Sequence, residues 1–140
     1  MNSRGFTLIE LIIVLAITAV LSGIILFSIS QYISRGKDSN ISANLAVLVT
    51  AGEAFYNSYG SYEGFCENSV VSNAVSQMPQ RDGGFYCLVN ELGNKWAACA
   101  EEFSNRSYAY CVDSRGVKKE ICSEDCRGGI IECPQMGACE

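Results

Sequence analysis

The sequence predicts an α+β protein, with one long N-terminal helix packed on a small antiparallel sheet of three or four strands and a disulfide-rich C-terminal tail. Three observations lead to this fold class. An uncharged apolar run extends from Leu11 to Ser34, an amphipathic pattern follows it, and short β-like runs with eight cysteines make up the remainder. A chain of 140 residues has room for an anchor and one small domain.

The apolar run is long enough to cross a bilayer, because about 20 residues at ~1.5 Å each span its ~30 Å core. One acid, Glu10, stands at its front edge. Such an acid costs roughly 2.5–3.5 kcal/mol at a helix centre and less near an end. The apolar residues from Leu11 to Ile29 outweigh this cost, so the run inserts in the membrane. Once it is there, the carboxylate of Glu10 needs a positive partner. A secretory signal cut near Ala16 or Ala19 and an uncut signal anchor are alternatives, but neither explains Glu10.

Residues 4–11, RGFTLIEL, resemble the class III signal of type IV pilins and type II secretion pseudopilins. The resemblance implies that a prepilin peptidase removes the leader, residues 1–5, by cutting after Gly5, and that the new N-terminal residue, Phe6, is then methylated. It also implies that Glu10 recognises the N-terminal amine of a neighbouring subunit during assembly.

Composition excludes some functions. The chain has 10 basic and 15 acidic residues, a net charge of −5, and this acidic balance argues against a general nucleic-acid-binding protein. It has no histidine, so the usual general base and the commonest metal ligand are missing. The local basic cluster of Arg115, Lys118 and Lys119 is interpreted as a solvated hairpin.

The amphipathic pattern continues the helix beyond the apolar run. Apolar residues recur every three or four positions from Ile41 to Tyr59, which predicts one nearly continuous helix from about Phe6 to about Ser58. Gly60 follows as its C-cap. The expected parts are a transmembrane and filament-core helix (6–34), an amphipathic helix half (35–59) and a small globular domain (60–140).

A meander of short strands follows a loop that has room for a short helix between Asn68 and Gln77. Its four β-like runs are Phe85–Asn90, Trp96–Phe103, Tyr108–Asp113 and Val117–Ile121. The apolar face of this sheet is expected to cover the helix stripe. The order of long helix, loop and meander resembles the pilin fold.

Eight cysteines all follow the apolar run, which predicts four disulfides in an oxidising compartment. They are Cys66, Cys87, Cys99, Cys111, Cys122, Cys126, Cys133 and Cys139. We expect the first four to pair among themselves and the last four to hold the tail, Cys122 to Glu140, although sequence does not choose among 105 pairings. A zinc site formed by the last four is the alternative.

The family resemblance implies a structural subunit of a type IV pilus or pilus-like filament, anchored in the inner membrane with its N-terminus in the cytoplasm. Expected partners are other pilin or pseudopilin subunits, the prepilin peptidase, an inner-membrane assembly platform and the lipid bilayer. The alternatives are a type II secretion pseudopilin and a membrane-tethered, disulfide-rich binding domain. A strand-turn at Tyr110–Gly116 resembles one in pseudopilin-like proteins.

We expect neither an enzyme nor a cofactor, because no catalytic motif is found. The acidic pairs Glu101-Glu102 and Glu124-Asp125 are interpreted as solvated charge. A calcium site that uses Asp113 or the acids of the tail stays an alternative, since some pseudopilins bind calcium.

Overall fold

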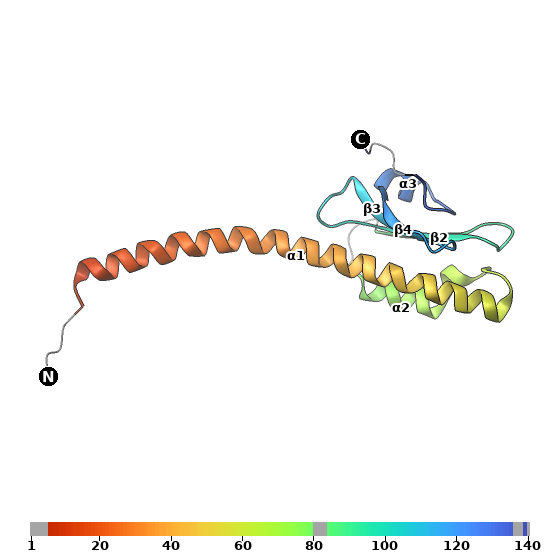
Figure 1. The fold of residues 1–140 in the computed structure, drawn as a ribbon, viewed down its shortest axis with the longest axis horizontal. Coiled ribbons are helices and arrows are strands. Elements are labelled where there is room, and N and C mark those ends of the chain that lie inside the picture. The colour runs from red at the N-terminus through yellow and green to blue at the C-terminus, as the bar shows by residue number, and fades with distance from the viewer. Residues whose placement is uncertain (1–5, 80–83, 136–138, 140) are drawn as a thin grey trace. The chain divides into compact units, whose positions relative to one another are not determined.

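The computed structural model describes residues 6–79, 84–135 and 139, and divides into two compact units, one up to Ile33 and one from Ser34 onward. The elements in chain order are α1 (Leu8–Tyr59), the 3-10 helix η1 (Phe65–Glu67), α2 (Ser69–Gln77), β1 (Phe85–Val89), β2 (Trp96–Glu101), β3 (Tyr108–Asp113), β4 (Lys118–Cys122) and α3 (Ser123–Arg127) (Figure 1). The predicted α+β class, a long helix with a small antiparallel sheet, is confirmed.

Helix α1 contains 52 residues and belongs to both units. The helix ends at the predicted C-cap. Gly60 adopts a φ of 71° and donates its N–H to the carbonyl of Tyr56 at 2.7 Å. In its first part the apolar side chains are exposed all round the helix axis. By length and composition, α1 can cross a membrane.

The four strands form one antiparallel sheet in the order β1-β2-β3-β4, which confirms the predicted meander. In the register, Trp96 lies opposite Val89 and Cys99 opposite Cys111. All six residues of β2 are buried, so the sheet is covered on both faces there. This burial explains why the sequence of β2, WAACAE, shows no alternation of apolar and polar residues.

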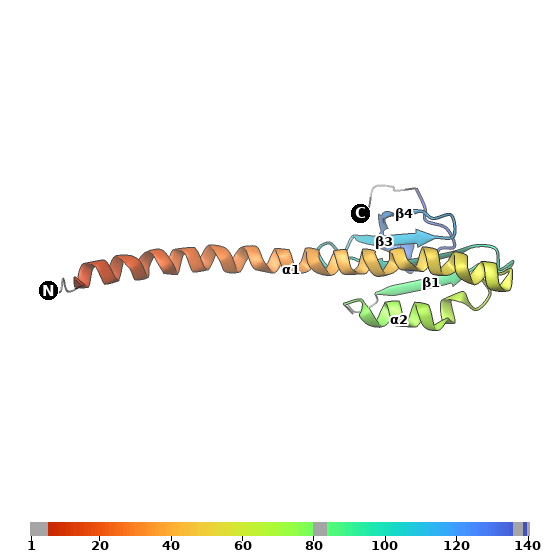
Figure 2. The ribbon, with the colours of Figure 1, turned by 60° about the horizontal axis from the view of Figure 1, so that its bottom comes forward.

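The first face of the sheet packs on helices. Buried side chains of α1 and α2 form one cluster with alternate residues of β2 and β3, and Figure 1 shows both helices on the side of the sheet away from α3. The central members of this helix-side cluster are Ile41, Leu45, Leu48, Val71, Ala74, Trp96, Ala98, Ala100 and Val112. Figure 2 shows β1 and α2 beside the last turns of α1, and partly buried residues of β1 complete the cluster.

Gly52 lets the largest side chain of this cluster approach α1. A Cβ atom at Gly52 would lie 2.8 Å from the Nε1 and Cζ2 atoms of the Trp96 indole, closer than packed atoms come. The indole is completely buried and lies against the ring of Phe65, with 4.7 Å between the ring centroids. A glycine at this position therefore fixes how closely the sheet packs on the helix.

The second face is covered by the residues after β4, from Ser123 onward, which we call the C-terminal segment. Cys99, Ala109, Cys111 and Ile121 of the sheet pack there against Cys126 and Cys133 of the segment. The unit from Ser34 onward therefore has three layers, in the order helices, sheet and C-terminal segment.

Each of the four strands carries one cysteine that bonds to a segment outside the sheet. The disulfides are Cys66–Cys87, Cys99–Cys126, Cys111–Cys133 and Cys122–Cys139. The prediction of four disulfides is confirmed, and since no cysteine is free, the zinc alternative is wrong. The expected pairing is wrong for Cys99 and Cys111, which bond to the C-terminal segment. The reason is that the segment lies across the second sheet face, where both side chains point.

Candidate functional site

The start of α1 is closed by a reciprocal pair of residues, Thr7 and Glu10. The Oε2 atom of Glu10 accepts the Thr7 N–H at 2.9 Å and the Thr7 hydroxyl at 2.7 Å, while Thr7 Oγ1 accepts the Glu10 N–H at 3.4 Å. This geometry is a capping box, which satisfies N–H groups that a helix start leaves unpaired. The spacing T-x-x-E in the sequence signals such a box, whereas the partner expected above for Glu10 lies only in another chain.

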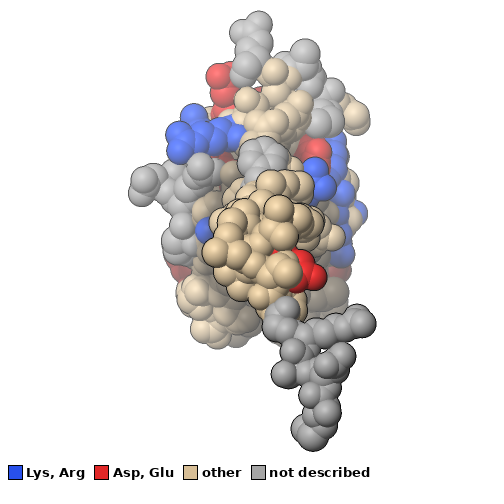
Figure 3. Space-filling view, turned by 90° about the vertical axis from the view of Figure 1, so that its left-hand side faces the viewer, with Lys and Arg blue, Asp and Glu red and all other residues tan. Residues whose placement is uncertain are grey.

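The surroundings of Glu10 are apolar. Glu10 is the only charged residue among those described up to Ile33. Figure 3 accordingly shows a single acidic side chain on the tan surface of the N-terminal helix. Both hydrogen bonds from Thr7 end on one carboxylate oxygen, and a carboxylate has acceptor positions for about four donors. Glu10 can therefore still bind a cationic group while it caps its own helix.

The predicted processing residues fall at the edge of the described chain. Gly5 lies outside the described residues, whereas Phe6 is described and its side chain is 79% exposed. Phe6 precedes Glu10 by four residues, so the amine that cleavage after Gly5 would create lies near the carboxylate along the chain. The roles of Gly5, Phe6 and Glu10 stay predictions.

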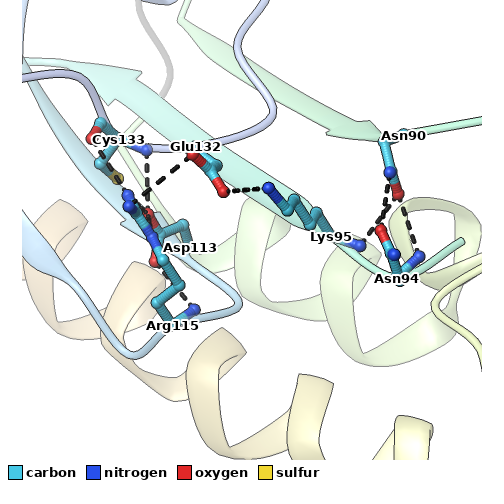
Figure 4. A network of polar contacts seen from close by, with 7 residues as sticks. All are labelled: Asn90, Asn94, Lys95, Asp113, Arg115, Glu132 and Cys133. Carbon is cyan, nitrogen blue, oxygen red and sulfur yellow. Dashed lines mark hydrogen bonds and ion pairs between the residues drawn. The ribbon is translucent and has the colours of Figure 1, made fainter. Parts of the chain in front are cut away.

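In the second unit, Asp113 at the end of β3 fastens the C-terminal segment (Figure 4). Its carboxylate is fully buried and accepts the N–H of Cys133 at 2.9 Å, the N–H of Arg115 at 2.9 Å and the guanidinium of Arg115. Arg115 in turn donates to the carbonyl of Cys133 at 3.3 Å. The interpretation of Arg115 as part of a solvated hairpin is therefore incomplete, since its guanidinium binds this buried acid.

The Asp113 carboxylate is held in its charged form. Burial would raise its pKa, but the hydrogen bonds from the Arg115 side chain and from the Cys133 and Arg115 N–H groups outweigh burial and lower the pKa below its ordinary value. These donors occupy both oxygens. We therefore assign Asp113 to holding the β3–β4 turn against the C-terminal segment rather than to calcium.

A second ion pair joins the same segment to the β1–β2 turn. Lys95 Nζ lies 2.7 Å from the Oε1 atom of Glu132. The turn before Lys95 is itself ordered by Asn90, whose Oδ1 atom accepts the N–H groups of Asn94 at 3.0 Å and Lys95 at 2.9 Å (Figure 4). The C-terminal segment is thus fixed to two sheet turns by polar contacts as well as by disulfides.

The loop between β2 and β3 is attached to α1 just after the boundary between the two units. The carboxylate of Asp38 accepts the N–H of Phe103 and, at 3.1 Å, that of Ser104. The Nζ atom of Lys37 lies 4.4 Å from the centre of the Phe103 ring, as in a cation–π contact. These contacts fix one end of the sheet on the helix.

The interpretation of the acidic pair Glu101-Glu102 as solvated charge is wrong. Glu101 is buried and pairs with the guanidinium of Arg127. Burial, together with the negative charges of Glu120 and Asp38, raises the pKa of Glu102 to about 7. Sequence gives no sign of this, because the three acids meet only in the folded sheet.

Comparisons with known proteins support the resemblance that was found at the start of the chain. Residues 1–26 match the prokaryotic N-terminal methylation motif. The type IV major pilin protein PilA of Myxococcus xanthus is 32% identical over 108 residues, which cover 77% of this chain and 43% of that protein. The chain is thus similar to type IV major pilins over about three quarters of its length, and its first residues carry the methylation motif. It spans less than half the length of this Myxococcus pilin.

Two further pilins are similar. The type IV wide pilus major component PilA4 of Thermus thermophilus is 28% identical over 110 residues, which are 72% of this chain and 84% of that protein. The type IV major alpha-pilin of Moraxella bovis is 45% identical over 51 residues, which are 36% of this chain and 32% of that protein. No solved structure matches the chain significantly.

Proposed function

We propose that this chain is a type IV pilin, a structural subunit of a type IV pilus or a pilus-like filament, and not an enzyme. The observation that carries the proposal is the single carboxylate of Glu10 at the start of an exposed apolar helix, within the methylation motif. In the proposed pathway a prepilin peptidase cuts after Gly5, and the amine of Phe6 becomes the cationic partner of Glu10 in a neighbouring copy. Three pilin relatives support this role.

Before assembly, the helix up to Ile33 anchors the chain in the cytoplasmic membrane, with the N-terminus in the cytoplasm and the disulfide-bonded unit outside. Four disulfides in the second unit support this topology, because such bonds persist in oxidising compartments. In the filament, apolar side chains of many N-terminal helices replace the lipid. An assembly platform in the inner membrane extracts the subunits.

The test replaces Glu10 with Gln, which keeps the shape of the side chain and removes its charge. We expect the variant to insert in the membrane as the parent chain does. Its amount in the sheared surface fraction should fall by about tenfold or more, because the loss of an ion pair worth about 1.4 kcal/mol lowers an equilibrium constant tenfold. The matched control is Glu63→Gln, which removes an exposed acid of the second unit and should leave filament yield unchanged.

Mass spectrometry of the same fractions identifies the N-terminal residue and so shows whether the leader has been removed. An N-terminal Phe6 heavier by one methyl group is expected in the membrane and in the filaments. Normal filament yield from Glu10→Gln would refute the proposed role of the carboxylate. An unprocessed N-terminus at Met1 would refute the filament role as a whole and favour the tethered binding domain. Processed chains confined to membranes would indicate a pseudopilin.

A further inference from the structure

Cys99 and Cys111 face each other across β2 and β3, yet they are not bonded to each other. Both side chains are completely buried on the sheet face that the C-terminal segment covers. The N–H of Glu102 bonds to the carbonyl of Tyr108, so these residues form a hydrogen-bonded pair. Pair types alternate along an antiparallel ladder, so the two cysteines, three positions along it, form a non-hydrogen-bonded pair.

This register brings the two sulfurs within bonding range. Cα atoms of a non-hydrogen-bonded pair lie about 4.5 Å apart, and disulfides span Cα distances of about 4.4–6.8 Å. The bond that the structure contains from Cys99 closes 27 residues and the bond from Cys111 closes 22, whereas the two cysteines are separated by 12. Closing the shorter loop is favoured by about threefold on chain entropy alone.

The sheet can form before the C-terminal segment docks on it. Among the described residues, the helix-side cluster contains none after Val112, so α1, α2 and the first three strands pack without the described part of the segment. Hairpins form in about 1–10 μs, while disulfides take seconds to hours. Two thiols therefore lie side by side on an uncovered sheet face while the cysteines of the segment are still mobile.

We infer that a Cys99–Cys111 disulfide forms as a competing product during folding, and that this chain needs a thiol–disulfide isomerase in addition to a thiol oxidase. The partner is a protein of that chemical class in the compartment where the second unit folds. The inference goes beyond the filament role and does not depend on it.

The chemistry balances in three steps. A disulfide of the oxidase takes two electrons and two protons from Cys99 and Cys111 and becomes a dithiol. The isomerase thiolate then attacks the Cys99 sulfur and releases the Cys111 thiolate, and the thiolate of Cys126 displaces the isomerase, so no electrons are gained or lost. A second oxidase disulfide joins Cys111 to Cys133. The isomerase is essential where Cys126 and Cys133 have already bonded to each other, because neither then has a thiolate that could open Cys99–Cys111. In that case the isomerase opens the bond at Cys99, the released Cys111 thiolate attacks Cys133, and the freed Cys126 thiolate displaces the isomerase from Cys99, so no oxidant is needed for this second stage.

Trypsin separates the two candidate bonds. Cleavage after Lys95, Arg106 and Arg115 gives the peptides Trp96–Arg106 and Ser107–Arg115, each with one cysteine. A Cys99–Cys111 bond joins these two peptides directly. The bonds in the structure instead join each of them to peptides that follow residue 119.

The full chain is reduced in detergent micelles and oxidised with oxidised glutathione, with or without a disulfide isomerase. Samples are blocked by alkylation over time, digested without reduction and weighed. We expect the joined pair Trp96–Arg106 and Ser107–Arg115 early, its persistence with oxidant alone, and its loss with isomerase. Final pairing reached at the same rate and yield in both arms, with the joined pair never seen, would overturn the inference.

Paired serine variants provide the control. Cys111→Ser with Cys133→Ser removes the competing bond together with one final bond, and we expect its three remaining disulfides to form without isomerase. Cys66→Ser with Cys87→Ser also removes one bond but leaves Cys99 and Cys111 intact, so it should still need isomerase. If the first variant does not fold, the time course of the unchanged chain decides; equal isomerase dependence of two folded variants would contradict the inference.

Discussion

The two units of this chain differ in how they expose their apolar residues. Up to Ile33 the large apolar side chains are exposed, with Leu8 at 77% and Val20 at 65%. From Ser34 onward, α1 has the same helical geometry, but Leu45 and Leu48 are completely buried. The difference shows that one continuous helix can belong to two regions with different sources of stability.

In the proposed function, lipid or neighbouring helices stabilise the first unit, because its own apolar side chains are exposed. The second unit is stabilised from within, by the helix-side cluster, by buried polar contacts such as that of Asp113 and by four disulfides. Changes to internal contacts should therefore affect the second unit and leave the first untouched.

Reduction of the disulfides should have the largest effect of this kind. Each bond contributes about 2–4 kcal/mol to small domains, and three of the four hold the C-terminal segment on the sheet. In detergent micelles, we expect reduction to remove the amide hydrogen-exchange protection of β3 and β4 while the helix up to Ile33 stays protected. Unchanged protection of β3 and β4 after complete reduction would show that packing alone holds the segment.

Gly52 tests the packing between α1 and the sheet. A Cβ atom at this position meets the Trp96 indole, so Gly52→Ala should destabilise the second unit by about 1–2 kcal/mol, even after the gain in helix propensity. Gly36→Ala is the matched control, because a Cβ atom there meets nothing, and it should stabilise by about 0.5–1 kcal/mol. Urea unfolding followed by Trp96 fluorescence measures both. Two substitutions that shift the midpoint equally would contradict the packing argument.

Sequence predicted what local pattern determines. The uncharged run from Leu11 to Ser34, the helical spacing from Ile41 and the cap at Gly60 were enough to place α1, and short runs between turns were enough to place the meander. The methylation motif was sufficient to propose the roles of Gly5, Phe6 and Glu10.

The disulfide pairing and the polar contacts were beyond the sequence, because they depend on segments far apart in the chain. Cys99 and Cys111 are neighbours in the sheet, so a local argument pairs them, but the C-terminal segment crosses that face and takes both sulfurs. In the same way, the sequence offered Asp113 only as a candidate calcium ligand, because its partner Cys133 lies 20 residues further along the chain.

Asp113→Asn tests whether polar contacts hold the C-terminal segment. An amide has one acceptor oxygen and no charge, so the variant should lose about 2–3 kcal/mol of stability, as expected for buried bonds to a charged group. Glu132→Gln is the control, because it weakens only partly exposed ion pairs, with Lys95 and with Arg115, and should cost less than about 1 kcal/mol. Chemical denaturation at pH 7 measures both, and equal losses would refute the assigned role of Asp113.

The pH dependence of this contribution has a definite sign. The pKa of Asp113 is lowered in the folded state, so its stabilisation is present above the unfolded pKa of about 3.9 and is lost as the pH falls through the lower folded pKa. Below that range the parent chain and Asp113→Asn should have similar stability. A difference that persists undiminished at such a pH would argue against charge as the cause.

Glu102 should give the smallest effect, with the opposite sign. Burial and the charges of Glu120 and Asp38 raise its folded pKa to about 7, so between pH ~4.3 and 7 the folded state holds a proton that the unfolded state has released. Stability should fall as the pH rises through this window. Glu102→Gln removes that loss and should stabilise the chain by about 1 kcal/mol at pH 8, because solvent screens a half-buried group, with no gain at pH 4. The same gain in stability at both pH values would show that packing, and not the charge of Glu102, is the cause. The ionisation of Glu102 would then make no contribution to the stability of the second unit.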